Sequence, residues 1–383
     1  MYSRNIQSDI DQYLNDDSHK VFFIWGPRRS GKTTILKKLA QDLDLPIFNF
    51  DVLSDREQFL PDRTTLQNLV SNFKVILIDE VQNHPESTLS LKILFDEFNI
   101  KVIATGSSEI RQKSTNFDSL AGRFTEHFCL PLSIAEITSN NQEPSYKQLA
   151  FQNKLKEDIQ IFGSYPEIYT AKNQSNPAKI DLLQNILDTF ILKDVVNIYN
   201  LKDTKLAKDI LTKIALQIGS EVSLREIANS LNANVMTVSN YIEIFIKNYI
   251  LIPLPSFKTN LRRAVSQNRK LYYYDLGIRN ILVKDFRPLN LRPDKGGLFE
   301  NFIISEVEKQ KRNKNIQCTF YFYREYNGQE VDLVIEDYQK RYSCIEIKTN
   351  PNHKTKTIFP LPHHLTYITP KNYFSEIANL SIL

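Results

Sequence analysis

The sequence predicts a multidomain α/β protein, and three observations support this fold class. From Val21 to about Pro131, apolar strands alternate with amphipathic helices, which is typical of a parallel sheet covered on both faces. Polar breaks at 140–145 and 173–179 then flank helical sequence. After Lys295 the pattern predicts one helix, three strands, a short helix and a last strand. The 383 residues are enough for two or three domains with ordinary cores.

The composition narrows the class of protein. Hydrophobic residues make up 42% and charged residues 24%, as in soluble globular proteins. No apolar run is long enough to cross a membrane. The N-terminus carries one helix face of Ile6, Ile10, Tyr13 and Leu14 in place of the apolar core of a signal peptide. The three cysteines are scattered and form no CxxC pair, which predicts a cytoplasmic protein without a zinc site or disulfide.

The first strand runs into a glycine-framed loop and a helix. Gly26 and Gly31 frame the loop, and Lys32 and Thr33 follow directly, which is the spacing of a P-loop. The glycines let backbone N–H groups close on phosphate oxygens, and the helix N-terminus adds partial positive charge. Lys32 is expected to reach the β- and γ-phosphates of ATP, and Thr33 to bind Mg²⁺. The residues predicted to contact the nucleotide here are Gly26, Pro27, Arg28, Arg29, Ser30, Gly31, Lys32, Thr33 and Thr34.

A second apolar strand, residues 75–78, ends in two acids. Asp79 is predicted to bind Mg²⁺ through water, and Glu80 to orient and deprotonate the attacking water. Two acids at a strand end also suit a simple turn, but the phosphate loop upstream favours the catalytic interpretation.

Two further stretches of this region carry candidate residues. A third strand ends in Thr105, Gly106, Ser107 and Ser108, whose hydroxyls are candidates to sense the γ-phosphate, with Ser107 the predicted nucleotide contact. Ordinary turn chemistry is the alternative. Arg123 is predicted to stabilise developing phosphate charge, in its own subunit or a neighbour's, with a surface salt bridge as the alternative.

Positive charge is concentrated in one segment. Between Lys258 and Lys295 there are ten Lys or Arg and three Asp, a net charge of +7 in a chain whose total is +4. This segment predicts contact with a polyanion such as DNA or RNA. The alternative is a solvated surface.

The segment from Glu221 to Leu254 predicts helix, turn, helix and strand, similar to a winged helix. Its two apolar stripes are Leu224, Ile227, Ala228 and Leu231, and Val238, Tyr241, Ile242 and Phe245. The segment has few basic residues, whereas phosphate contacts dominate affinity for DNA. We therefore expect a packing or partner-binding module, with any DNA contact made by the basic segment that follows.

Acidic residues and a lysine meet in the strand-rich tail. Glu346 and Lys348 are two residues apart and therefore face the same side of a strand. Asp332 begins the neighbouring strand, and Glu300, near the start of the preceding helix, is the candidate third carboxylate of the site. We predict that Asp332 and Glu346 hold Mg²⁺ against a phosphate while Lys348 acts on water or on the developing charge. The alternatives are a dead site on an inherited fold and a charged rim of a half-buried sheet.

The ordered motifs resemble a known family. "GPRRSGKTT", "ILIDEVQ", "TGSS", "LAGR" and "PLSIAEI" are similar to the AAA-superfamily ATPases of bacteria and archaea that carry a C-terminal domain of unknown function. In the tail, "FGSYPEIY", "KLYYYDLGIRNIL", "GGLFENFIISEV" and "EVDLVIE" with "IEIK" resemble that second domain. The resemblance covers nearly the whole chain from Ile6. Ser164 stands where the family often has a second glycine.

The resemblance implies an ATPase with four segments. These are an AAA-type domain at 1–138, a helical lid or connector at 139–205, a winged-helix segment at 206–257 and a PD-(D/E)xK restriction-endonuclease-like domain at 258–383. The sequence thus supports an ATPase coupled to a nucleic-acid-directed, nuclease-like domain. The alternative is an ATP-dependent switch whose tail recognises a protein or nucleic acid without cutting. A small-molecule kinase is a weaker option, because the Asp79–Glu80 pair favours water as the acceptor, and oligomer formation stays open.

Overall fold

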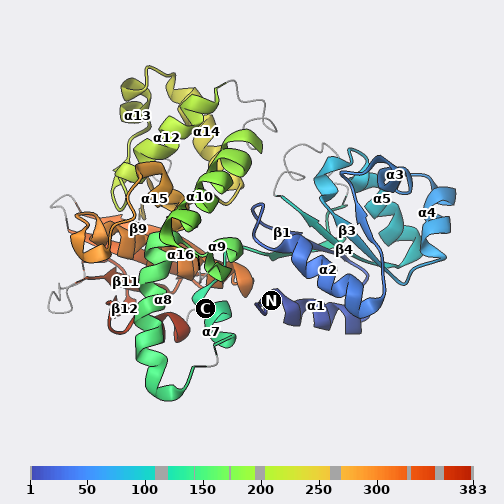
Figure 1. Cartoon of the computed structure of the whole chain (residues 1–383), viewed down its shortest axis with the longest axis horizontal. Coiled ribbons are helices and arrows are strands. Elements are labelled where there is room, and N and C mark those ends of the chain that lie inside the picture. The colour runs from blue at the N-terminus through green and yellow to red at the C-terminus, as the bar shows by residue number, and fades with distance from the viewer. Residues whose placement is uncertain are drawn as a thin grey trace. The chain divides into compact units, whose positions relative to one another are not determined.

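The computed structural model divides the chain into two compact units, Met1–Leu130 and Pro131–Leu383 (Figure 1). The structure describes residues 2–107, 120–141, 143–171, 174–194, 203–258, 269–325, 329–349 and 358–380. Within these ranges, none of the helices has the length and apolar character needed to cross a membrane.

The first unit is built on a five-stranded sheet in the order β2-β3-β4-β1-β5, in which every pairing is parallel. The predicted parallel sheet is therefore confirmed. Phe22 and Ile24 of β1 share a core with α1 and α2, whereas Phe23 and Trp25 are buried on the opposite face. The strands are β1 (Val21–Trp25), β2 (Ile47–Asn49), β3 (Val75–Asp79), β4 (Lys101–Gly106) and β5 (Phe124–Phe128), and the helices are α1 (Ile6–Asn15), α2 (Lys32–Leu43), α3 (Leu53–Glu57), α4 (Arg63–Val70) and α5 (Ser87–Ile93).

The second unit begins with helices around one apolar core. The predicted stripes of the 221–254 segment are buried in this core, except Leu231, which is half-buried against it. A three-stranded antiparallel sheet, β6-β8-β7, closes the core. The elements are α7 (Ile134–Ser139), α8 (Gln148–Phe162), α9 (Pro166–Thr170), α10 (Asn176–Ile186), α12 (Thr204–Leu216), α13 (Leu224–Ser230), α14 (Val235–Lys247), α15 (Leu276–Val283), β6 (Glu221–Val222), β7 (Leu251–Pro255) and β8 (Arg269–Tyr273). The winged-helix assignment stays a prediction.

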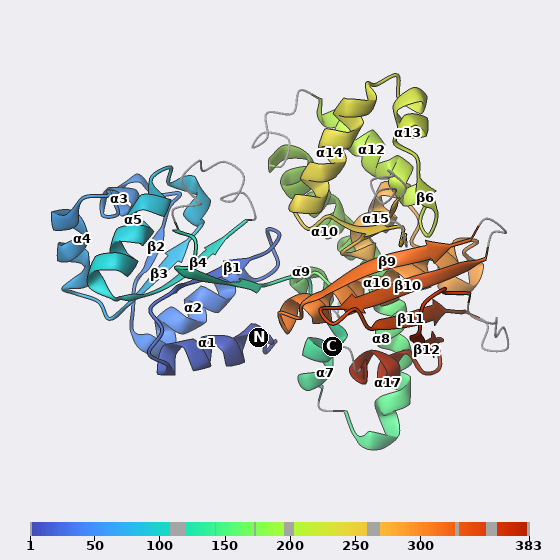
Figure 2. The same ribbon diagram turned by 180° about the vertical axis from the view of Figure 1, so that it is seen from behind.

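A second sheet of this unit has the order β12-β11-β10-β9, with β11 and β12 parallel and the other pairs antiparallel (Figure 2). Helix α16 packs on this sheet. The elements are α16 (Lys295–Asn313), β9 (Cys318–Arg324), β10 (Glu330–Asp337), β11 (Tyr342–Ile347), β12 (His363–Ile368) and α17 (Tyr373–Ala378). The short helix expected before the last strand falls largely on residues 350–357, outside the described residues. Helix α17, after β12, is not predicted by the sequence pattern.

Residues 131–139 belong to the second unit because α16 binds them. Glu306 Oε2 accepts a hydrogen bond from Ile134 N at 2.7 Å, and Lys309 Nζ donates to Leu132 O at 3.1 Å. The compact unit therefore ends at Leu130, whereas the sequence places the domain boundary at 138.

The turn after α8 shows why Ser164 is tolerated. Ser164 N donates to Asp275 Oδ2 at 2.6 Å, and Ser164 Oγ accepts from buried Lys309 Nζ at 3.0 Å. Gly163 has φ 79°, and a Cβ there would lie 2.0 Å from Asp275 Oδ1. This turn requires the first glycine, while the serine hydroxyl has a partner of its own.

Asn301 joins α16 to β8 through two backbone hydrogen bonds. Its Nδ2 donates to Tyr273 O at 2.7 Å and its Oδ1 accepts from Tyr273 N at 2.8 Å, and the side chain is fully buried. We expect Asn301→Ala to lower the free energy of unfolding of the second unit by about 2–4 kcal/mol, because two buried backbone groups lose their partners. Calorimetric unfolding checks this. Asn229→Ala, at an exposed helix position, is the control, and equal losses in both variants would contradict the assignment.

Candidate functional site

The loop between β1 and α2 is shaped by close backbone approach. Gly31 has φ 105°, and a Cβ at Gly26 would lie 2.0 Å from Cys129 O. Both positions therefore require glycine. Buried Arg4 binds the loop and the end of the first unit: its Nη1 donates to Ser30 O at 2.8 Å, and its Nη2 donates to Leu130 O at 2.5 Å. Arg4 is a residue that sequence reasoning missed, since its partners lie far along the chain.

Lys32 folds into this loop. Its Nζ donates to Gly26 O and Pro27 O, each at 2.9 Å, and the side chain is buried. Burial lowers the pKa of Lys32. The nearby acids raise this pKa in part, and Glu80 has the largest effect among them. Thr33 and Thr34 are exposed in the first turn of α2. The loop backbone, the Lys32 ammonium and the exposed N-terminus of α2 lie together. This arrangement is suited to binding a phosphate. Of the other predicted contacts, Ser30 is buried, Arg28 is half-buried and Arg29 is exposed.

The predicted Mg²⁺ carboxylate lies at the end of β3, beside β4. Asp79 is buried, and its Oδ1 accepts hydrogen bonds from Thr105 Oγ1 and, at 3.2 Å, from Glu80 N. Ile78 pairs with Ala104, so the parallel register brings Asp79 and Thr105 to the same edge of the sheet. In parallel sheets this carboxyl edge is where ligands bind.

Glu80 is connected to the end of β4 by Gln82. Gln82 Nε2 donates to Glu80 Oε2, and Gln82 Oε1 accepts from Ser107 N at 3.3 Å. A Cβ on Gly106 would lie 2.8 Å from Gln82 Oε1, so a side chain there would displace the amide. The Ser107 hydroxyl is buried without a hydrogen-bond partner among the described residues, and Ser108 lies outside them. Sequence reasoning missed Gln82. Its position two residues after Glu80 is the feature of the sequence that could have indicated a role beside the acid pair.

Arg123 lies away from the loop of its own chain. It directly precedes β5, and its carbonyl accepts from Val21 N at the start of β1, whereas the phosphate loop follows the end of β1. Five residues of strand separate the two edges by roughly 16 Å. Arg123 Nε pairs with Asp96 Oδ1 at 2.7 Å. The structure thus places Arg123 away from the loop of its own subunit, and its action on a nucleotide, in its own subunit or a neighbour's, stays a prediction.

A cluster of carboxylates forms where α16 meets β10. One oxygen from each of Glu300, Glu330 and Asp332 lies within 4.8 Å of the others, a spacing that suits a metal ion. The pairing of β10 with β9 shifts register between Val331 and Val334, and this bulge carries Asp332. Burial raises the pKa of both Glu300 and Asp332.

Lys348 joins Asp332 to Glu346. Its Nζ lies 2.7 Å from Glu346 Oε2 and 3.5 Å from Asp332 Oδ2, and the same Asp332 oxygen accepts from Ile347 N at 2.7 Å. Burial alone would lower the pKa of Lys348, but Asp332 and Glu346 together raise it. The predicted residues are thus brought together, although Glu346 lies outside the cluster of three carboxylates.

A buried lysine that sequence reasoning missed offsets part of the negative charge of the cluster. Lys270 Nζ pairs with Glu300 Oε1 at 3.0 Å and with Glu330 Oε1, and its side chain is 2% exposed. Tyr272 OH donates to Glu300 Oε1. Burial alone would lower the pKa of Lys270, but the two glutamates raise it. Glu330 lies two residues before Asp332, and Lys270 lies two residues before Tyr272. Because residues two apart in a strand face the same side, this spacing was the signal that could have placed Glu330 and Lys270 at the site.

This finding limits the predicted polyanion contact of the 258–295 segment, which stays a prediction for its other cations. Lys270 and two arginines of the segment are buried in ion pairs: Arg279 Nη1 lies 2.5 Å and Arg292 Nη2 2.8 Å from Asp294 Oδ2. Arg269 pairs with Glu243 at 2.6 Å. These four cations are held by carboxylates and are not free for a polyanion. Residues 259–268, with Arg262 and Arg263, lie outside the described residues.

Three family models match successive parts of the chain. Residues 18–138 match an AAA domain, 153–293 match a domain of unknown function (DUF8612) and 295–369 match a domain of unknown function (DUF4143). The expected AAA domain is confirmed for the first of these regions. The acidic site draws Lys270 and Tyr272 from the second region and its carboxylates and Lys348 from the third. The winged-helix and restriction-endonuclease-like folds stay predictions.

Similar proteins have been recorded in bacteria and archaea. An uncharacterized protein of Haemophilus influenzae is 26% identical over 73% of this chain and 73% of its own length. The uncharacterized protein MJ1544 of Methanocaldococcus jannaschii is 27% identical over 92% of this chain and 80% of its own. Among solved structures, the RuvB Holliday junction branch migration motor of Thermotoga maritima is 15% identical and covers 66% of this chain and 89% of its own, with a TM-score of 0.32. That score is too low for the likeness to carry an argument.

Removing the Lys270 ammonium should expose the repulsion that it offsets. We expect Lys270→Ala to lower the free energy of unfolding of the second unit by about 3–5 kcal/mol, because Glu300 and Glu330 are left buried without their cation. Urea unfolding followed by circular dichroism checks this. Lys205→Ala, at an exposed helix position, is the control. A loss below about 1 kcal/mol in Lys270→Ala would mean that the two carboxylates are neutralised in another way.

Proposed function

We propose that the first unit binds ATP with Mg²⁺ and hydrolyses it. The observation that carries this proposal is the convergence of Lys32, Asp79 and Glu80 at the carboxyl edge of one parallel sheet. Lys32 and the loop N–H groups would hold the phosphates, and Thr33 and Asp79 would hold Mg²⁺. The metal would neutralise charge on the β- and γ-phosphates. Asp79 Oδ1 already accepts two hydrogen bonds, which fixes the carboxylate for this role.

Glu80 would orient the attacking water and accept its proton. Gln82 holds the Glu80 carboxylate and is itself held by Ser107 N, so the base is positioned from β4. The buried Ser107 hydroxyl, which lacks a hydrogen-bond partner among the described residues, is suited to a γ-phosphate oxygen or the water. Arg123 would act on the nucleotide of a neighbouring subunit, which requires an oligomer.

We propose further that the second unit is directed at nucleic acid and carries a nuclease-like site. The supporting observation is Lys348, in contact with both Asp332 and Glu346. Four buried or half-buried carboxylates, Glu300, Glu330, Asp332 and Glu346, face two lysines, Lys270 and Lys348. The acids exceed the lysines by two charges, which suits one divalent cation held by Asp332 and Glu346. Lys348 would then act on water or stabilise the phosphate.

The second candidate is an ATP-dependent switch whose second unit binds a partner without cutting. One observation favours it: Lys270 already lies between Glu300 and Glu330, and Glu346 is 1% exposed. Lys270 thus offsets part of the repulsion between these acids without a metal. A protein partner or a nucleic acid would then bind elsewhere on this unit.

The nucleotide site is tested by two substitutions. Lys32→Ala is expected to abolish most ATP affinity, because it deletes the charge aimed at the phosphates. Glu80→Gln is expected to keep binding and to slow hydrolysis by roughly 10²-fold or more, the scale of a lost general base. Fluorescent-nucleotide titration and phosphate release measure the two effects. Lys37→Ala, exposed on α2, is the control, and equal hydrolysis by wild type and Glu80→Gln would remove Glu80 from the mechanism.

The acidic site is tested by metal binding and cleavage together. Asp332→Ala is expected to abolish both, because Asp332 is the carboxylate that belongs to the cluster with Glu300 and Glu330 and also contacts Lys348, while Lys348→Ala should keep the metal and lose cleavage. Calorimetric Mn²⁺ titration without nucleotide and a panel of DNA and RNA substrates measure these effects. Both variants should keep ATPase activity. The control is Glu336→Gln on the same strand, outside the cluster. Nucleic-acid binding with neither metal binding nor cleavage would leave the non-cutting switch as the function.

A further inference from the structure

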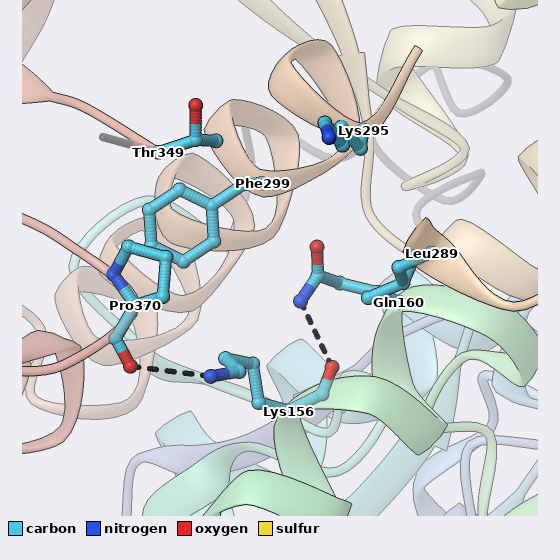
Figure 3. Close-up of a pocket in the computed structure, with 7 residues that line it drawn as sticks. All are labelled: Lys156, Gln160, Leu289, Lys295, Phe299, Thr349 and Pro370. Carbon is cyan, nitrogen blue, oxygen red and sulfur yellow. Dashed lines mark hydrogen bonds between the residues drawn. The ribbon is translucent and has the colours of Figure 1, made fainter. Parts of the chain in front are cut away.

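A pocket of about 380 Å³ lies in the second unit (Figure 3). Two of its lining residues adjoin residues of the acidic site in the chain: Phe299 precedes Glu300, and Thr349 follows Lys348. The volume falls in the range typical of small-molecule sites. The pocket lies outside the residues assigned to metal or phosphate above.

The pocket is positively charged. Lys156 and Lys295 line it, and its lining includes no carboxylate. Lys156 Nζ donates to Pro370 O at 3.2 Å and to Asn153 Oδ1 at 3.3 Å, so its contacts are with uncharged acceptors. Among the described residues, no carboxylate lies within ion-pair distance of either lysine. Lys295 also begins α16, whose N-terminus adds partial positive charge.

A buried amide faces the same space. Gln160 is 2% exposed, and its Nε2 donates to Lys156 O at 3.0 Å. Its Oε1 accepts no hydrogen bond from a described residue, and Figure 3 shows this oxygen turned away from the Lys156 backbone. An amide oxygen that faces a pocket without a protein donor can accept a hydrogen bond from a ligand. Leu289, Phe299 and Pro370 supply the apolar part of the wall.

We propose that this pocket binds one nucleoside phosphate, with the phosphate at Lys156 and Lys295 and a base N–H donated to Gln160 Oε1. The apolar residues lie against the base or sugar. This deepens the proposed function and rests on it for the source of the ligand. In a bound nucleic-acid strand, the phosphodiester to be cut would lie at the acidic site and an adjacent nucleotide would lie in this pocket. A free mononucleotide has the same chemistry.

The test uses the full chain with Lys32→Ala, which silences the phosphate loop, in EDTA so that no metal site contributes. AMP and a fluorescent single-stranded oligonucleotide are the probes, titrated by calorimetry and anisotropy. Lys156→Gln and Lys295→Gln should each weaken binding about tenfold, the scale of one charge-assisted contact. For the oligonucleotide, the log–log salt slope should fall by about 0.7 per lost phosphate contact. Lys154→Gln, exposed on the same helix, is the matched control and should bind as before.

Gln160→Glu is a second variant of nearly the same shape. It places a carboxylate in the pocket and should abolish binding of both probes, with thermal unfolding measured to confirm that the unit is folded. Binding of the oligonucleotide alone assigns the pocket to a strand, and binding of AMP alone assigns it to a free nucleotide. Unchanged affinity in the lysine variants, or no binding of either probe by the parent, overturns the proposal. Failure of the proposed nuclease-like function is separate, since it appears as absent Mn²⁺ binding and cleavage.

Discussion

The ammonium of Lys270 allows three acids to lie together in the second unit. Glu300 comes from α16 and Glu330 and Asp332 from β10, so their repulsion acts between two elements that must pack. Lys270, on β8, reaches both glutamates and is almost fully buried. Asn301, the next residue after Glu300, fixes α16 to β8 through the backbone of Tyr273. Helix α16 and strand β8 are thus held together both by the neutral hydrogen bonds of Asn301 and by the Lys270–Glu300 ion pair.

The two units reach their candidate sites by different physical routes. In the first, the edge of a parallel sheet gathers chemically useful residues because every strand ends there, and the register of β3 with β4 places Asp79 beside Thr105. In the second, antiparallel strands and a helix converge, and the site depends on buried ion pairs. The first arrangement is set by backbone geometry, whereas the second is set by the balance of buried charges.

The sequence predicts local features well and distant partners badly. The phosphate loop, its helix and the strand-end acids are each encoded within a few residues, and strand alternation places Glu346 beside Lys348. Lys270 was counted as surface charge because its partners lie 30 residues or more away in the chain and become visible only when α16 packs on β8. Arg123 suits phosphate by residue type, but the direction of β5 carries it to the far edge of the sheet. Arg4 binds backbone carbonyls, and Gln82 accepts from the backbone N–H of Ser107, and such backbone partners leave no trace in residue type.

The Arg4 contacts have a mechanical consequence. One guanidinium nitrogen binds Leu130 O, where the first unit ends, and the other binds Ser30 O within the loop. Cys129 N donates to Trp25 O at 2.7 Å, and the Cys129 carbonyl packs against Gly26. A pull on the chain as it leaves the first unit must therefore break these bonds or drag the loop with it. A force on the chain at Leu130 would therefore also act on the loop that we propose holds the phosphates.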